Sequence, residues 1–197
     1  MVYSRHGLMI AAERLELSFL CGSRSRLLPF IVAMMGAAVF YGDPRWIGLS
    51  WALLAVWLGL HDLARRNAFR QGLAAFSARA VLSGYVWLVY AGGRVTLQGF
   101  PYSAGPAVDA ILHSVFVGFV LSMVMAHGPI IFPALWKSSM TFTRWFYLPL
   151  LILHAGLFCR IFLNRDTGAL LNILALGLYA ITLLLHRSRG KNLFLRS

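Results

Sequence analysis

Charge is scarce in this chain, and negative charge is scarcer still. Of its 197 residues 12% are charged, and only six are Asp or Glu, whereas ordinary soluble domains carry roughly 25% charged residues. The hydrophobic share is 59%, which is more apolar surface than a soluble fold of this size can bury. The composition therefore excludes a soluble globular domain and predicts a protein whose partner and solvent is a lipid bilayer.

The signatures of several enzyme classes are also absent. The chain holds no Walker loop and no GxSxG, HExxH or CxxCH element, so no motif indicates a nucleotide hydrolase, a serine hydrolase, a zinc protease or a c-type cytochrome. Its two cysteines, Cys21 and Cys159, lack zinc-finger spacing and are interpreted as free thiols. The apolar runs hold almost no carboxylates, which argues against a proton-coupled transporter. Whether the chain is an enzyme stays open.

Long apolar runs are what the sequence does contain. A bilayer core about 30 Å thick requires roughly 20 apolar residues in a helix. Six runs approach this length, the first of them short, and the fourth extends to residue 136 if its helix continues past Pro129. They cover residues 27–41, 46–63, 80–93, 110–126, 145–163 and 168–186. We expect an all-α, polytopic transmembrane bundle of about six helices.

The basic residues indicate how this bundle is oriented. The formal net charge is +12, but the Lys and Arg side chains cluster at the ends of the apolar runs, so a nucleic-acid partner is not expected. If the N-terminus is inside, one side holds fourteen basic residues and the other four, which is the bias of cytoplasmic loops. The four are Arg45, Arg94, Arg160 and Arg165. We therefore predict cytoplasmic N- and C-termini and a multi-pass protein of a cell membrane, with the bacterial inner membrane favoured.

Three regions follow from these boundaries. Residues 1–26 form a cytoplasmic N-terminal segment without a signal peptide, residues 27–186 form the transmembrane domain, and residues 187–197 form a basic tail. Within the first region, residues 7–20 place apolar side chains at helical spacing. This pattern predicts an amphipathic helix lying on the inner membrane surface. A helix that docks on a partner protein is the alternative.

Histidines inside the predicted spans are the main chemical lead. His113 and His127 lie fourteen residues apart in the fourth span. In a continuous α-helix they differ by about 40° in azimuth and by roughly 21 Å in height. They would then share one face at opposite depths, an arrangement that could place two cofactors in the two leaflets.

A second pairing joins His127 to the fifth span. His127 and His154 are nearly equidistant from the turn near residues 139–141, so antiparallel packing predicts a similar depth for both. Imidazole is a usual ligand of haem iron and of copper. We predict that the two rings face the bundle interior within reach of a common ligand, with His61 as a further candidate metal ligand. The alternative is that each histidine simply bonds a backbone carbonyl or a hydroxyl.

Other residues offer supporting roles. Asp109, one turn before His113, could orient that ring or pair with Arg94. Arg160, six residues after His154, could neutralise an anionic haem propionate or reach outward to the membrane surface. The Gly128-Pro129 step predicts a kink or an end of the fourth helix near His127, and broken backbone at membrane depth is tolerated where it lines a cavity.

Part of the chain resembles a known family. The stretch His113-Ser-Val-Phe-Val-Gly118-Phe-Val-Leu-Ser-Met123, followed by His127-Gly128-Pro129 and by a span that ends Phe158-Cys159-Arg160, resembles the NnrS family. That family comprises polytopic haem- and copper-containing membrane proteins linked to nitric oxide and denitrification. The resemblance covers about residues 109–163 and implies cofactor roles for His113 and His127. The chain is about half as long as usual members and lacks their His-Glu and Gly-His-Thr-Gly-Arg elements.

Three functions follow in order of preference. The first is an integral membrane protein that binds haem b or copper through intramembrane histidines, in respiration or in nitric oxide metabolism. The second is a non-catalytic subunit or assembly factor of a larger membrane complex, or a homodimer, since the chain is small and lacks enzyme motifs. The third is a channel or carrier for a small neutral molecule, supported by the Gly-Pro step after His127.

Overall fold

The architecture comes from a computed structural model that describes residues 42–101, 103–135 and 138–188. The first helices, in chain order, are α3 (Pro44–His61), α4 (Leu63–Asn67), α5 (Leu73–Gln98) and α6 (Pro106–His113), continued by the π-helix η1 (Ser114–Val120) and by α7 (Leu121–Leu135). A 3-10 turn η2 (Arg144–Phe146), α8 (Tyr147–Phe162) and α9 (Arg165–Leu185) follow. Two-residue strands β1 (Ser139–Met140) and β2 (Arg187–Ser188) pair antiparallel. The all-α prediction is confirmed, apart from this short pair.

Capping residues explain where several helices begin and end. Asp43 precedes Pro44 and accepts a hydrogen bond from the Arg45 backbone N–H at 2.9 Å, so α3 begins there. Asp62 separates α3 from α4 and accepts from the Ala64 N–H at 3.0 Å. Asn164 caps α9 in the same way through Thr167. Short polar breaks therefore divide a mostly apolar chain into separate helices.

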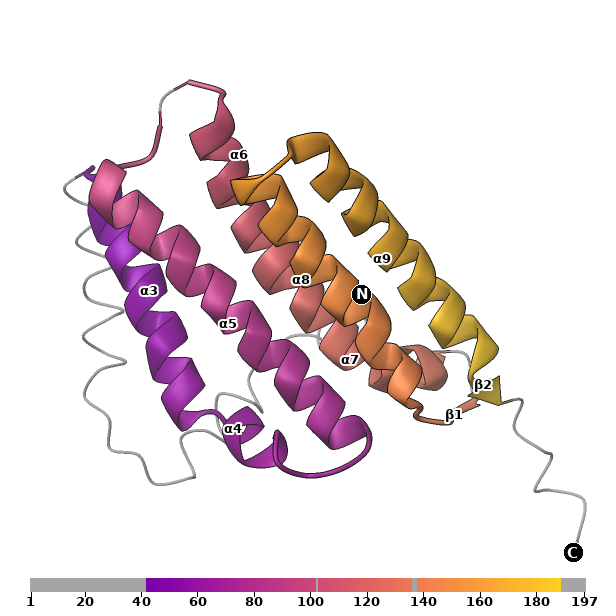
Figure 1. Cartoon of the computed structure of the whole chain (residues 1–197). Coiled ribbons are helices and arrows are strands. Elements are labelled where there is room, and N and C mark those ends of the chain that lie inside the picture. The colour runs from indigo at the N-terminus through magenta and orange to yellow at the C-terminus, as the bar shows by residue number, and fades with distance from the viewer. Residues whose placement is uncertain (1–41, 102, 136–137, 189–197) are drawn as a thin grey trace, which may run out of the picture.

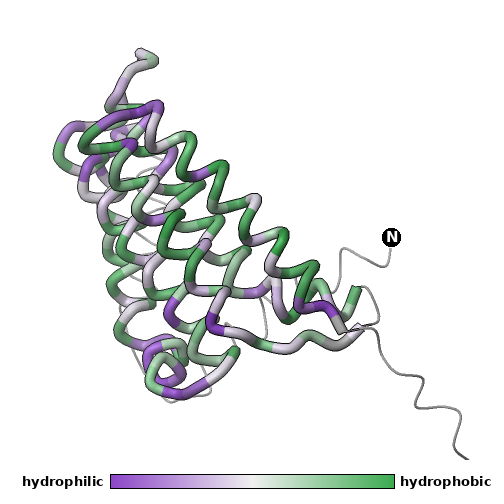
Figure 2. The backbone as a smooth tube through the Cα atoms, turned by 45° about the vertical axis from the view of Figure 1, so that its right-hand side comes forward, coloured by the Kyte–Doolittle hydropathy of each residue, from purple (hydrophilic) through white to green (hydrophobic). Residues whose placement is uncertain are grey.

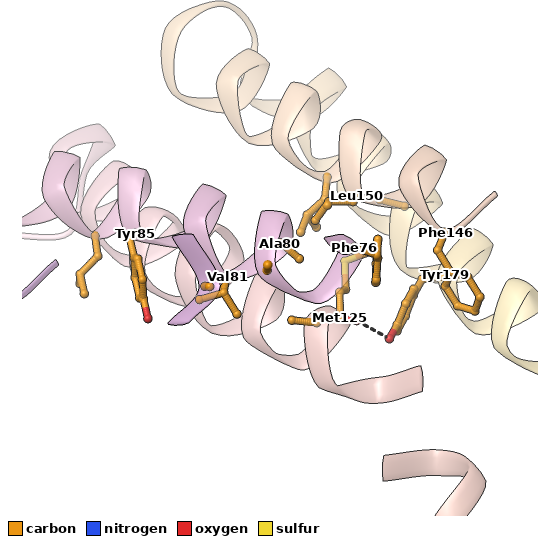
Figure 3. Close-up of a cluster of buried hydrophobic side chains, with 14 of the residues drawn as sticks. Phe76, Ala80, Val81, Tyr85, Met125, Phe146, Leu150 and Tyr179 are labelled. Carbon is orange, nitrogen blue, oxygen red and sulfur yellow. Dashed lines mark hydrogen bonds between the residues drawn. The ribbon is translucent and has the colours of Figure 1, made fainter. Parts of the chain in front are cut away.

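The long helices run side by side with alternating direction. Figure 1 shows α3 next to α5, α5 next to α6–η1–α7 and α8, and α9 on the outer side of α8. A buried aromatic cluster lies where α5, α7, α8 and α9 meet, and Phe76 and Phe146 are fully buried in it (Figure 3). Figure 2 shows hydrophobic residues along the middle of the bundle and hydrophilic residues gathered at its two ends.

Four of these helices are long and apolar enough to cross a membrane: Leu73–Gln98, Pro106–Leu135, Arg144–Phe162 and Arg165–Leu185. Their outer faces carry bulky apolar side chains that are more than half exposed, among them Leu151, Leu170 and Ile173, as expected for surfaces that meet lipid. The expected six spans are thus reduced to four that the described residues support. The expected first span and the N-terminal amphipathic helix lie outside the described residues.

Two span boundaries differ from expectation. The helix expected over residues 80–93 extends from Leu73 to Gln98, because Arg79 and Arg94 continue the helix although they interrupt its apolar run. For the fourth span, the alternative in which the helix continues past Pro129 is the one found, since the helix runs through Pro129 and Pro133 to Leu135. The second expected span, residues 46–63, corresponds to α3, which ends at His61 because Asp62 caps the next helix.

Candidate functional site

Two hydroxyl groups support the proline-containing part of α7. Proline at 129 has no N–H to donate to the carbonyl of Met125, four residues earlier. The Tyr179 hydroxyl from α9 donates to that carbonyl instead, at 2.9 Å (Figure 3). The Ser77 hydroxyl from α5 donates to the neighbouring Ala126 carbonyl at 2.7 Å. The backbone just before His127 is therefore held by hydrogen bonds from two other helices.

His127 and His61 present the same nitrogen to the backbone. The His127 Nδ1–H donates to the Met123 carbonyl at 2.7 Å, and the His61 Nδ1–H donates to the Trp57 carbonyl at 3.0 Å. Because a carbonyl can only accept, Nδ1 carries the proton in each ring. The Nε2 atom of each neutral imidazole then keeps its lone pair, which is the atom needed to bind a metal.

These two histidines line one pocket at the end of the bundle that carries α4. The pocket has a volume of about 590 Å³, within the range of roughly 300–1,000 Å³ typical of small-molecule sites. Its described lining comes from α3, α4, α5 and α7, with Asp62 between the first two of these. The lining residues are Trp57, Leu58, His61, Asp62, Leu63, Ala64, Asn67, Leu73, Ala74, Ser77, Ala78, Val81, Tyr85, Met123, His127 and Ile130.

A carboxylate and a phenol hold the polar wall of this pocket together. The Tyr85 hydroxyl on α5 donates to Asp62 Oδ2 at 2.6 Å, while the other oxygen of Asp62 caps α4. One carboxylate thus joins α3, α4 and α5 around the pocket. The His61 ring stacks on the Trp57 ring with centroids 5.2 Å apart, which fixes the orientation of the imidazole. The Trp57 carbonyl fixes which nitrogen is protonated.

His154 lies elsewhere, and both of its nitrogens are occupied. Trp87 Nε1–H donates to His154 Nδ1 at 2.9 Å, so the neutral ring carries its proton on Nε2 and donates it to the Ser83 hydroxyl at 2.8 Å. Ser83 and Tyr85 are about 200° apart around α5. His154 therefore packs on the face of α5 that points away from the pocket. The structure does not bring His127 and His154 together as the depth argument predicted.

The other predicted residues gather at the opposite end of the bundle. Arg160 donates twice to Asp109, at 2.7 Å and 3.1 Å, and Arg165 lies 3.9 Å from the same carboxylate. The His113 Nδ1 contacts the Asp109 carbonyl at 2.9 Å and its carboxylate at 3.3 Å. Asp109 thus pairs with Arg160 rather than with Arg94, and Arg160 does not approach the pocket that holds His127.

The π-helix changes the relation between His113 and His127. Residues Ser114–Val120 form η1, and each π turn closes i→i+5 bonds, taking more residues per turn than an α-helix. The azimuth of about 40° expected for a continuous α-helix therefore does not apply. Gly118 lies in η1, and a Cβ atom there would overlap Trp87 of α5, so this segment brings two helices into close contact.

The donor set of the pocket fits some groups better than others. Across the described residues, no three His, Cys, Asp or Glu side chains lie close enough to hold one metal ion. A preformed mononuclear copper centre built from such ligands is therefore not favoured. Haem iron needs only one or two axial imidazoles from the protein, since the macrocycle supplies the remaining ligands. The pocket offers two imidazoles with available Nε2 lone pairs and a largely apolar wall, which is the kind of lining that haem requires.

Comparison with known proteins places the chain in a family. A family model described as "Domain of unknown function (DUF8744)" matches residues 5–187. The chain belongs to this family. The match spans every helix described above, but the family's description assigns no activity. No curated protein and no solved structure matches the chain.

Sequence reasoning identified the histidines but missed most of their surroundings. Asp62 and Tyr85 form the shortest hydrogen bond at the pocket, yet Tyr85 looks like an ordinary aromatic residue of an apolar run. Trp57 has a detectable signal, because it precedes His61 by four residues and so shares its helix face. The pocket itself forms because α3 and α7, which are far apart in sequence, both pack against α5.

Proposed function

We propose that this chain is a multi-pass membrane protein that binds haem, most simply haem b, through His61 and His127. One observation carries the proposal: the two histidines line the same pocket, and each keeps an unprotonated Nε2 because its Nδ1 donates to a backbone carbonyl. A ring held in this way resembles axial histidines, whose second nitrogen is usually bonded to a carbonyl or carboxylate. Respiration or nitric oxide metabolism is the proposed setting, in line with the partial resemblance to the NnrS family.

Charge asymmetry supports the proposed orientation in a cell membrane. Among the described residues, the α4 end holds Arg65, Arg66, Arg70, Arg79, Arg144 and Arg187 but only Asp62 as an acid. The opposite end holds four arginines and three aspartates. Cytoplasmic loops are rich in Lys and Arg, so we place the α4 end, with its pocket, on the cytoplasmic side. We also propose α3 as a further span beside α5.

The test is the spectrum of the protein purified in detergent after expression with added haem precursor. We expect a Soret band, bound iron close to one per chain, and loss of both in His127→Ala and His61→Ala. Membrane insertion should be unchanged, since it depends on the apolar spans. Copper content measured on the same sample would reveal copper as the metal instead.

His186→Ala is the matched control. His186 makes the same contact, with its Nδ1 2.9 Å from the Thr182 carbonyl, but it does not line the pocket. The variant should keep the wild-type spectrum. A wild-type protein without a Soret band, or an absorption that survives both alanine substitutions, contradicts the proposal.

A further inference from the structure

Two arginines lie on or just after α4, the helix whose Leu63, Ala64 and Asn67 line the pocket, and no described carboxylate pairs with them. Leu63 and Asn67 of α4 line the pocket. Arg66 follows Leu63 by three residues, which makes the two neighbours on the helix surface. The Arg70 backbone N–H donates to the carbonyl of Asn67, a pocket-lining residue, at 3.0 Å. Both arginine side chains are exposed.

Among the described residues, no carboxylate pairs with these two arginines. The ion pairs of the described residues all involve Asp109, at the other end of the bundle. Asp62, the one acid at the pocket end of the described chain, is bonded to Tyr85 and to the start of α4. Arg79 is engaged by the Ala68 carbonyl and the Tyr147 hydroxyl, and Arg65 contacts the Leu60 carbonyl. For Arg66 and Arg70 the described residues provide no side-chain partner.

We infer that the ligand of this pocket is an amphipathic dianion whose two acidic groups lie on Arg66 and Arg70 at the rim, while its apolar body lies between α3, α5 and α7. The inference rests on the proposed function and deepens it: it assigns the propionates of haem to the α4 end and not to Arg160. Arg160 is already paired with Asp109, through two hydrogen bonds, at the far end. Carboxylates and guanidinium groups match in charge and in hydrogen-bonding geometry.

The experiment compares two porphyrins that differ only at their two acidic side chains, which are free carboxylates in one and methyl esters in the other. Iron protoporphyrin IX and its dimethyl ester are titrated into the detergent-purified full chain in zwitterionic micelles, and binding is followed by absorbance. In Arg66→Gln/Arg70→Gln the affinity for the diacid should fall about fivefold, since two solvent-exposed charge pairs contribute on the order of 1 kcal/mol in total. The affinity for the diester should stay within about twofold of wild type.

Two control variants test whether charge at this rim is responsible. Arg66→Lys/Arg70→Lys keeps the charge and should retain most of the affinity for the diacid. Arg45→Gln/Arg165→Gln removes two arginines from the opposite end and should bind the diacid like wild type. Because all four positions changed are exposed arginines, these variants should fold.

The possible outcomes distinguish the role of the two arginines from the proposed haem binding by His61 and His127. Equal affinity of wild type and the Arg66/Arg70 glutamine variant for the diacid overturns the rim assignment but leaves histidine-dependent haem binding intact. Equal loss of affinity for diacid and diester also overturns it, because the arginines would then act on the apolar body. If wild type binds neither porphyrin, the proposed function fails and this inference fails with it.

Discussion

The two faces of α5 show how differently the same kinds of residue can be used. On one face, Ser77, Val81 and Tyr85 border a pocket with two histidines whose Nε2 atoms are unprotonated. On the other, Trp87 and Ser83 bind both nitrogens of His154. From the sequence we expected His127 and His154 to lie at similar depth, and the structure places them on different faces of α5. The comparison teaches that a histidine's availability depends on what the adjacent helix places next to it.

The comparison predicts that stability falls most when volume is added on the face of α5 that carries Ser83 and Trp87, where neighbouring side chains already fill the space. Gly118→Leu would place a Cβ atom 2.5 Å from the Trp87 side chain and 2.9 Å from Leu157. We expect the free energy of unfolding to fall by about 1–3 kcal/mol, as overpacking does, measured by SDS-induced unfolding in mixed micelles.

Gly93→Leu is the control for this change, because a Cβ atom there meets nothing within 4 Å. It should leave the free energy of unfolding near the wild-type value. Equal stability of the two variants would mean that η1 and α5 are not in close contact.

A smaller effect is expected from removing the polar network on the same face. His154→Leu leaves Trp87 Nε1–H without its acceptor and removes the hydrogen bond that the Ser83 hydroxyl accepts, while Ser83 still donates to the Ala80 carbonyl. Side-chain hydrogen bonds between membrane helices average about 0.6 kcal/mol, so two of them predict a loss of about 1 kcal/mol in the free energy of unfolding. The haem spectrum should not change, since His154 does not line the pocket. Loss of the Soret band in this variant would restore His154 as a ligand.

The smallest effect on stability is expected when volume is added on the pocket-lining face of α5. Ala74 lines the pocket and is exposed, so Ala74→Leu adds volume where there is room for it. Its free energy of unfolding should stay within about 0.5 kcal/mol of wild type, while less haem is retained after purification. A variant as unstable as Gly118→Leu would show that this face is packed as tightly as the other.

The candidate site could be predicted only in part from the sequence. The residue types, the proline step after His127 and the depth of each histidine follow from spacing along single helices. His61 and His127 share a pocket because α3 and α7 both pack on α5, and no local pattern encodes that contact. The predicted pairing of His127 with His154 failed because similar depth along two helices does not fix the rotation of either helix.

The sequence by itself determined that the chain lies in lipid and that its secondary structure is helical. Apolar runs of membrane length must form helices in lipid, because every backbone N–H and carbonyl then finds a partner within its own segment. The polar breaks at Asp43, Asp62 and Asn164 set where helices begin. Only the tertiary structure decided which nitrogen of each histidine stays available, since the rotation of each helix results from packing. Tyr85 and Trp87, two residues apart on α5, point to different neighbours, and one borders a pocket while the other closes a network.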